Sequence, residues 1–263
     1  MRRETVICLL IGVAAGMLAG LTGVGGGVFL VPLLVGALYL PQHEAHGTSF
    51  VVIFPIAVVG TITYAAMGHM EWGLILGLAL GGVLGVLLGV RLMMLLPENR
   101  LRWLWGVFII AIGFIMVISP WGEPAGGEAA AAASFGWTSF GIAIPIGFVS
   151  GILAGMMGIG GGVVLIPALV MIMGVSQHIA QGVSLAVISF MSLLGVLAHY
   201  RLENVRLRVA LWIIPAAALF SFVGSYVASY LSGEFLRDFV GSVIIVVGVV
   251  TVVRGWRIRE VEG

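Results

Sequence analysis

The string Gly-Val-Gly-Gly-Gly at residues 23–27 occurs a second time as Gly-Ile-Gly-Gly-Gly at residues 158–162. A shift of 135 residues aligns residues 16–32 with residues 151–167, and 11 of these 17 positions are identical. The same shift, without a gap, aligns Gly60 with Gly195 and Gly89 with Gly224. The chain is therefore an internal duplication, which is how many secondary transporters are built.

The composition is that of a membrane protein. Hydrophobic residues make up 61% of the chain, charged residues make up 9%, and the mean hydropathy is +1.21, whereas a soluble domain has about 25% charged residues. A net charge of +1 without a basic run gives no sign of a nucleic-acid partner. The single Cys8 excludes an intramolecular disulfide and a cysteine-rich metal site, and we expect no cofactor. The sequence leaves open whether the chain forms a homo-oligomer.

Each repeat contains five apolar segments, which we take as helices because a membrane crossing needs about 20 apolar residues. They cover residues 5–21, 28–40, 47–66, 72–96 and 101–118, and then 139–157, 163–175, 182–200, 209–231 and 238–254. The second segment of each repeat is short, so we expect a glycine-broken hairpin with the first. The sequence thus predicts an all-α, polytopic integral membrane protein with repeats at 1–118 and 139–263 and an extracytoplasmic linker at 119–138. A signal peptide is the alternative for the first segment, but its copy lies mid-chain.

The arginines predict the orientation, because the chain has twelve of them and no lysine. If the first two segments of each repeat return to their starting side, eleven arginines lie on one side and only Arg237 on the other. The positive-inside rule makes that side the cytoplasm and places both termini there, in a cytoplasmic membrane. A hairpin plus three crossings is an odd number of traverses, so the second repeat is expected to be inverted.

The two glycine strings are the first candidate site. Irregular backbone at membrane depth is tolerated where it is buried in protein or lines a polar cavity, and the helix that follows each break would begin with free N–H groups and about half a positive charge. Two such ends facing each other suit a small anion. The candidate residues are Thr22, Gly23, Gly25, Gly26, Gly27, Gly158, Gly160, Gly161 and Gly162. Simple helix packing is the alternative; a dinucleotide site lacks the strand context it needs.

A polar stretch before the third segment of each repeat is the second candidate. Hydroxyls, amides and imidazoles there can donate hydrogen bonds to an anion, although interfacial loop residues are the alternative for His43. The candidates are Gln42, His43, His46, Thr48 and Ser49, with Gln177, His178, Gln181 and Ser184 in the second repeat. The order Gly47-Thr48-Ser49 also suggests the start of a helix. No Asp or Glu lies in mid-segment, which argues against a carboxylate proton relay or metal site.

Three motifs together resemble the sulfite exporter (TauE/SafE) family of membrane permeases. They are the glycine string with its downstream proline, Ala-His-Gly-Thr-Ser at residues 45–49, and the Tyr64-x3-Gly68-His69 stretch. The resemblance extends over nearly the whole chain apart from the linker. It implies transport of sulfite, organosulfonates or related small anions across the cytoplasmic membrane.

The residues and the resemblance together predict a secondary transporter, not an enzyme. We expect it to export a small anion by alternating access around the two opposed breaks, with the anionic substrate and the lipid bilayer as its partners. A small-anion channel is the alternative, and it would show unsaturable flux. An intramembrane enzyme would need a nucleophile with its base, for which Ser49 near His43 or His46 is the only pairing to test.

Overall fold

The structure is a computed structural model that describes residues 2–118, residues 137–236 and scattered positions between 238 and 249. All the regular elements in these ranges are helices, as the sequence predicts. They are α1 (Arg2–Thr22), α2 (Gly27–Leu38), α3 (Gln42–Ala66), α4 (Trp72–Met94), α5 (Glu98–Ile118), α7 (Trp137–Met157), α8 (Gly162–Met173), α9 (Gln177–Arg201) and α10 (Leu207–Ala228). Residues 119–136 of the expected linker and much of the tenth expected segment lie outside the described residues.

The third segment of each repeat begins earlier than the sequence suggested. We expected it at residues 47 and 182, but α3 begins at Gln42 and α9 at Gln177. Pro41 and Ser176 precede these helices in extended conformations, and a proline before the first turn needs no N–H donor there. Gly47-Thr48-Ser49 consequently lies in the second turn of α3, and the expectation that its hydroxyls cap the helix start is wrong.

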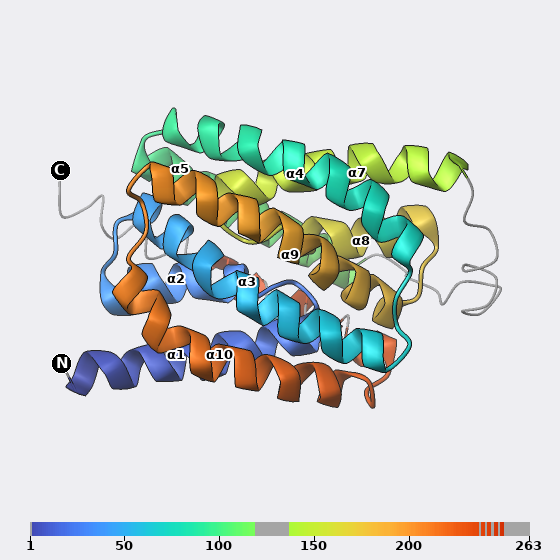
Figure 1. Ribbon diagram of the computed structural model, residues 1–263, viewed down its shortest axis with the longest axis horizontal. Coiled ribbons are helices and arrows are strands. Elements are labelled where there is room, and N and C mark those ends of the chain that lie inside the picture. Colours follow the sequence, from blue (N-terminus) through green and yellow to red (C-terminus); the bar gives the residue numbers. More distant parts are fainter. Residues whose placement is uncertain are drawn as a thin grey trace.

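The helices of the two repeats exchange their neighbours. α1 packs along α10, α7 packs along α4, and α3 packs against α9 in the middle of the bundle (Figure 1). Since α1 corresponds to α7 and α4 to α10 in the 135-residue alignment, the first helix of each repeat packs on the fourth helix of the other. The repeats are therefore interlocked and do not form two separate bundles.

Glycine contacts give the direction of each helix relative to its partner. Gly12 lies against Ile213 and Gly20 against Ser221, so α1 and α10 run in the same direction. Gly60 lies against Leu185 whereas Gly195 lies against Phe50, so α3 and its copy α9 are antiparallel. Figure 1 shows the same relation along the length of these helices.

The interlocked helices approach each other more closely than side chains would allow. A methyl group added at Gly16 would lie 2.8 Å from the Cα of Ala217 on α10. In the other repeat, a methyl group at Gly151 would lie 2.9 Å from the Cα of Gly82 on α4. Small residues at such contacts let membrane helices pack backbone to backbone, which is the main source of attraction where lipid and side chains are equally apolar.

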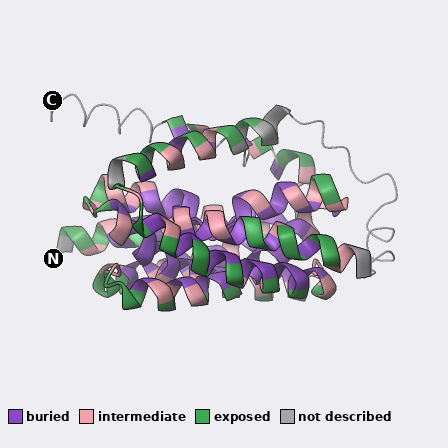
Figure 2. Ribbon diagram, turned by 90° about the horizontal axis from the view of Figure 1, so that it is seen from above, coloured by how far each residue is buried: buried purple, intermediate pink, exposed green. Residues whose placement is uncertain are grey.

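The outside of the bundle is apolar. Leu76, Leu80 and Leu84 on α4 and Leu211 and Leu219 on α10 are each at least 57% exposed, and exposed residues lie on the outer faces of the helices in Figure 2. Six of the described helices, α1, α3, α4, α7, α9 and α10, are long and apolar enough to cross a bilayer. Such a surface is stable in lipid and not in water, so the protein is a multi-pass membrane protein.

We predict that Gly16→Ala destabilises the bundle, because the added methyl group would push α1 from the backbone of α10. Overpacking of this kind costs about 1–3 kcal/mol. Gly141→Ala is the matched control, since Gly141 is exposed on α7 and has no neighbouring atom within 4 Å of the added methyl group. Thermal unfolding in detergent should show a lower midpoint for Gly16→Ala only. Equal midpoints for the two variants would contradict the packing account.

Candidate functional site

The two glycine strings lie face to face in the centre of the protein. A methyl group added at Gly27 would lie 2.6 Å from the carbonyl oxygen of Gly158, and one added at Gly162 would lie 2.6 Å from the Cα of Val24. Every residue of both strings is buried. The backbones of the two repeats therefore touch here, and no side chain separates them.

The two breaks share one backbone conformation. Three glycines in each have positive φ, a region that side chains other than hydrogen disfavour. The values are 70°, 87° and 80° at Gly23, Gly25 and Gly26, and 66°, 78° and 91° at Gly158, Gly160 and Gly161. This conformation ends the first helix of each repeat and starts a short second helix. α2 then returns toward the end of the bundle where α1 begins (Figure 1).

The breaks lie at half depth in the bundle. Gly25 and Gly160 both contact the side chains of Ile53 and Ile188, which occupy equivalent positions near the middle of the two 25-residue helices α3 and α9. Because α3 and α9 are antiparallel, their midpoints coincide at this level. The two isoleucines cover the breaks with apolar methyl groups.

The helix that follows each break starts with free N–H groups. In α2, the amides of Phe29 and Leu30 donate to the carbonyl of Gly26, so residues 26–28 have no acceptor within the helix. In α8, the amides of Val164 and Leu165 donate to Gly161 in the same way. Two positive helix ends thus lie close together, and neither is capped by a side chain.

The carbonyl ends of α1 and α7, in contrast, are satisfied by side chains of the opposite repeat. The Nδ1 of His46 lies 3.1 Å from the carbonyl oxygen of Met156, and the Nε2 of Gln181 donates to that of Leu21 at 3.1 Å. His46 and Gln181 are equivalent residues, and so are Met156 and Leu21. These two side chains, which we expected to line the anion site as donors, hold backbone carbonyls.

Ser49 and Tyr64 extend this carbonyl binding. The Oγ of Ser49 lies 2.7 Å from the carbonyl oxygen of Gly158 and 2.7 Å from that of His46. The hydroxyl of Tyr64 lies 3.1 Å from the carbonyl oxygen of Gly20 and 2.9 Å from the Oε1 of Gln181. Sequence reasoning named Tyr64 as a motif residue but not as a site residue. The sequence signal was a tyrosine within an apolar helix, because a buried tyrosine hydroxyl usually needs a hydrogen-bond partner.

The remaining polar candidates contact other parts of the fold. The Nε2 of Gln42 lies 3.0 Å from the Nε2 of His46, and the hydroxyl of Thr48 accepts a hydrogen bond from the backbone of Arg206 at 3.0 Å. The hydroxyl of Thr22 accepts from the amide of Val24 within the first break. His178 lies within 3.2 Å of the carbonyls of Ala228 and Leu231, at the end of α10 and away from the breaks.

Three candidates are left without such a contact. His43 is partly buried in the first turn of α3, so the loop alternative for it is wrong. The Oγ of Ser184 and the Nε2 of Gln177 are buried and have no hydrogen-bond partner in the described part of the chain. Ser184 occupies the position in α9 that Ser49 occupies in α3.

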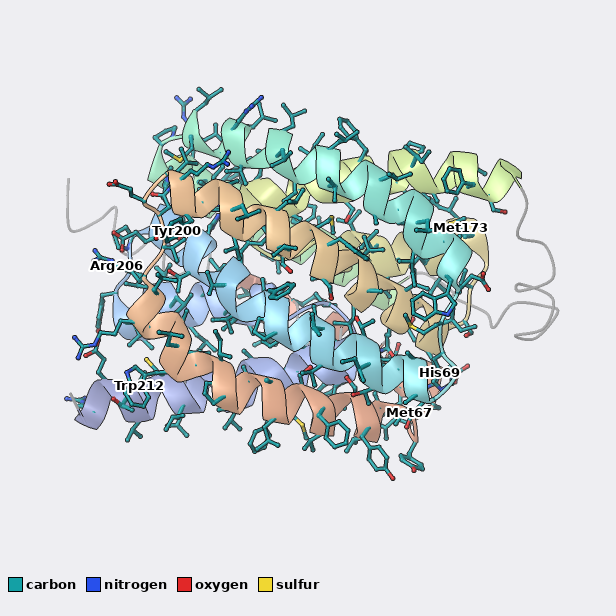
Figure 3. The ribbon with its side chains drawn as sticks, in the orientation of Figure 1. Met67, His69, Met173, Tyr200, Arg206 and Trp212 are labelled. Carbon is teal, nitrogen blue, oxygen red and sulfur yellow. The ribbon has the colours of Figure 1, made fainter. Side chains whose placement is uncertain are left out.

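Charged residues gather at one end of the bundle, which we call the arginine-rich end. It holds the starts of α1 and α10 and the ends of α4 and α9 (Figure 1), and with these helix ends Arg3, Arg91 and Arg201. Figure 3 shows Arg206 at the same end. The guanidinium of Arg206 binds both carboxylate oxygens of Glu44, with N···O distances of 2.6 and 2.9 Å, and this hydrogen bonding raises the pKa of Arg206. Figure 3 shows Met67, His69 and Met173 at the opposite end.

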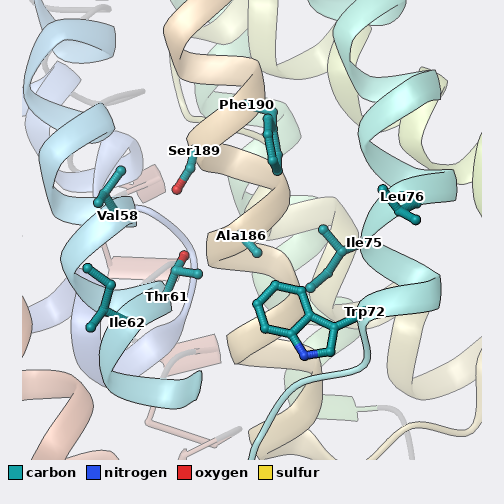
Figure 4. A pocket seen from close by; sticks show the side chains of 9 residues that line it. All are labelled: Val58, Thr61, Ile62, Trp72, Ile75, Leu76, Ala186, Ser189 and Phe190. Atoms are coloured by element: carbon teal, nitrogen blue, oxygen red, sulfur yellow. The ribbon is translucent and has the colours of Figure 1, made fainter. Parts of the chain in front are cut away.

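A groove of about 460 Å³ opens on the outside of the bundle between α3, α4 and α9 (Figure 4). Its two polar side chains, Thr61 and Ser189, hydrogen-bond to carbonyls of their own helices at 2.7 and 3.0 Å, and Trp72 at its edge is 63% exposed. The groove contains no residue of either break, so it belongs to the lipid-facing surface. Among the described residues, no group of three or more His, Cys, Asp or Glu side chains is placed to hold a metal ion.

Comparison with known proteins assigns the chain to a family. Residues 8–251 match the family described as Sulfite exporter TauE/SafE. A probable membrane transporter protein of Xylella fastidiosa (strain Temecula1) is 28% identical over 94% of this chain and 93% of its own length. The probable membrane transporter proteins YunE of Bacillus subtilis and MJ0441 of Methanocaldococcus jannaschii are 24% and 25% identical, each over 92% of this chain and at least 93% of their own lengths. No solved structure matches significantly.

The chain therefore belongs to the TauE/SafE family of membrane transporters. This confirms the family that the glycine strings, residues 45–49 and the Tyr64 stretch indicated. The match covers residues of both glycine strings.

We predict that Ser49→Ala destabilises the protein and that Ser184→Ala does not. The first change leaves the buried carbonyl of Gly158 without its donor, which costs about 1–3 kcal/mol. Ser184 is the equivalent residue and its hydroxyl makes no hydrogen bond within the described chain. Unfolding midpoints in detergent compare the two, and an equal loss in both variants would show that Ser49 contributes only packing.

Proposed function

We propose that this protein exports a small monoanion, hydrogensulfite (the singly protonated form of sulfite) or an organosulfonate, which binds between the N-termini of α2 and α8. The strongest support is that side chains bind the backbone carbonyls at the breaks but not the backbone amides. Side chains satisfy the carbonyl ends of α1 and α7, whereas the amides of residues 26–28 and 161–163 have no side-chain cap. Free amides are donors, and donors bind anions.

The charge at the breaks suits a singly charged ligand. Each helix start contributes about half a unit of positive charge, so the two together carry about one unit. Helices α2, α7 and α8 contain no charged side chain that would add to this charge or cancel it. A monoanion would be neutralised, whereas a dianion would leave an uncompensated charge at membrane depth, which is costly.

The direction of transport follows from the membrane potential. An outgoing monoanion gains about 2.3 kcal/mol per 100 mV when the inside is negative. Export therefore needs no coupling ion. The positive-inside rule makes the arginine-rich end the cytoplasmic end, and with it both ends of the chain, in the cytoplasmic membrane of the cell.

Alternating access is the mechanism we propose. The copies α3 and α9 are antiparallel and interlocked around the breaks, which is the arrangement of inverted-repeat transporters that rock around a central site. Both breaks are buried and covered by Ile53 and Ile188, so this structure corresponds to a state closed on both sides. If α3 and α9 shifted relative to each other, the breaks would become accessible first from one end of the bundle and then from the other. A permanently open channel would not be covered in this way.

Flux measurements on reconstituted vesicles test this function. We expect saturable flux of sulfite or an organosulfonate that increases with an imposed potential, and weaker flux of sulfate. Chloride serves as the test for unselective conduction. Flux that rises linearly with concentration would favour the channel, and no flux of any of these anions would contradict the proposal.

We predict that Gly160→Ala lowers this flux by about tenfold or more, the effect of losing about 1.4 kcal/mol of anion binding. The methyl group would enter the space between the break and the side chains of Ile53 and Ile188. Gly174→Ala is the matched control, because Gly174 has a similar positive φ of 65° but no atom within 4 Å of the added methyl group. Both variants place a side chain at a residue with positive φ. A similar loss of flux in both would assign the effect to strain and not to the site.

A further inference from the structure

Two sets of equivalent positions, 64 with 199 and 181 with 46, carry different side chains at the two ends of the bundle. Toward the end opposite the arginines, Tyr64 hydrogen-bonds to Gln181, and both are tied to the carbonyl end of α1. Toward the arginine-rich end the equivalent residues are His199 and His46. Tyr64 and Gln181 do not change protonation state near neutral pH, whereas histidine is the side chain that can.

His199 is buried without a partner. Its exposed fraction is 0%, and neither ring nitrogen has a hydrogen-bond partner in the described part of the protein. Its ring lies against that of Phe50, with 5.5 Å between centroids, and beside the backbone of Gly47. His46, in contrast, uses one ring nitrogen at Met156 and the other at Gln42. Tyr64 is thus held by two hydrogen bonds at one end, whereas its equivalent at the other end, His199, makes no hydrogen bond in the described part of the chain.

The charged and titratable groups around this pair are few. His43, in the first turn of α3, is close enough to affect both histidines electrostatically. Glu44 is paired with Arg206. Arg91 on α4, Arg201 on α9, Glu203 in the loop between α9 and α10, and Arg208 on α10 are exposed. Arg100 near the start of α5 and Arg3 and Glu4 at the start of α1 are exposed as well. Helices α2, α7 and α8 carry no titratable group. Among the side chains that the structure describes, no carboxylate forms a hydrogen bond or ion pair with His199 in this closed state.

We propose that His199, next to His46, is a proton-binding site that controls the opening of the arginine-rich end. A buried imidazolium without an acceptor is strongly unfavourable, so this end closes only when His199 is neutral. When the end opens, water reaches the ring, a proton binds, and the open state is stabilised. The proton regulates transport and does not travel with the anion.

This inference rests on the proposed alternating access, and it makes transport depend on pH at one face only. An imidazole in contact with water is half protonated near pH 6.5. At pH 5.5 only about one open molecule in eleven would have a neutral His199 and be able to close. Acid at the arginine-rich face should therefore slow transport by about tenfold, and acid at the opposite face should not.

A distance measurement tests the site without any transported anion. Spin labels are placed at Ala37 and Tyr200, two exposed positions at the arginine-rich end from different repeats, in a Cys8→Ser background. The equivalent positions Ile172 and Ala65 form the matched pair at the other end. We expect the population with a longer Ala37–Tyr200 distance to grow between pH 7.5 and 5.5, and the Ile172–Ala65 distance not to lengthen. His199→Tyr, which copies Tyr64, and His199→Gln should both abolish the change.

Flux measurements with the pH set separately on each face complete the test. Methanesulfonate is the probe because its charge stays constant over this range. Wild-type flux should fall about tenfold when the arginine-rich face is acidified, and His199→Tyr should remove that dependence. His178→Asn, at the other end, should keep it. A pH response that survives in both His199 variants, or that is lost in His43→Asn instead, would overturn the proposal.

The two proposals fail separately. A distance change that depends on His199 without flux of any anion would contradict the exporter and leave the proton site in place. Flux that does not respond to pH at either face would contradict the proton site and leave the exporter in place.

Discussion

The contact between the two glycine breaks is the constraint on which the rest of the structure depends. Gly27 meets the Gly158 carbonyl, and Gly162 meets the backbone of Val24, so the two repeats touch without any side chain between them. This contact is possible because Gly27 and Gly162 carry no side chain, and three glycines in each break adopt positive φ where the chain turns into the second helix. It fixes the N-termini of α2 and α8 at half depth and opposite one another. It also requires the helices that carry the breaks, α1 and α7, to lie close to α10 and α4, which their own small residues permit.

A break in a membrane helix leaves backbone amides and carbonyls without partners in the helix. In this protein, side chains bind carbonyls at the breaks, whereas the amides that begin α2 and α8 have no side-chain cap. His46, Ser49, Tyr64 and Gln181 bind carbonyl oxygens across the repeat boundary. They thereby fasten each repeat to the other and occupy carbonyls at the ends of α1 and α7. The amides that remain make the centre electropositive without a buried arginine or lysine. The anion transport that we propose would thus depend on which backbone groups the polar side chains leave uncovered.

The sequence predicted the fold well because its signals are periodic and redundant. The 135-residue repeat and the long apolar runs identified nearly every described helix, and the glycine strings identified the breaks. The start of α3 was missed because Gln42, His43 and Glu44 look like loop residues, whereas the proline before them begins the helix. The roles of His46 and Gln181 were also missed. Their acceptors, Met156 and Leu21, lie more than a hundred residues away and become neighbours only through the interlocking of the repeats.

The most direct test of this account is to locate a bound anion. Selenite has the shape and charge of sulfite and scatters X-rays anomalously, so a crystal of the protein soaked in selenite would show its position. The account predicts a peak between the N-termini of α2 and α8, within hydrogen-bonding distance of amides in residues 26–28 and 161–163. A peak anywhere else at concentrations that saturate flux, for example in the groove beside Trp72, would contradict it.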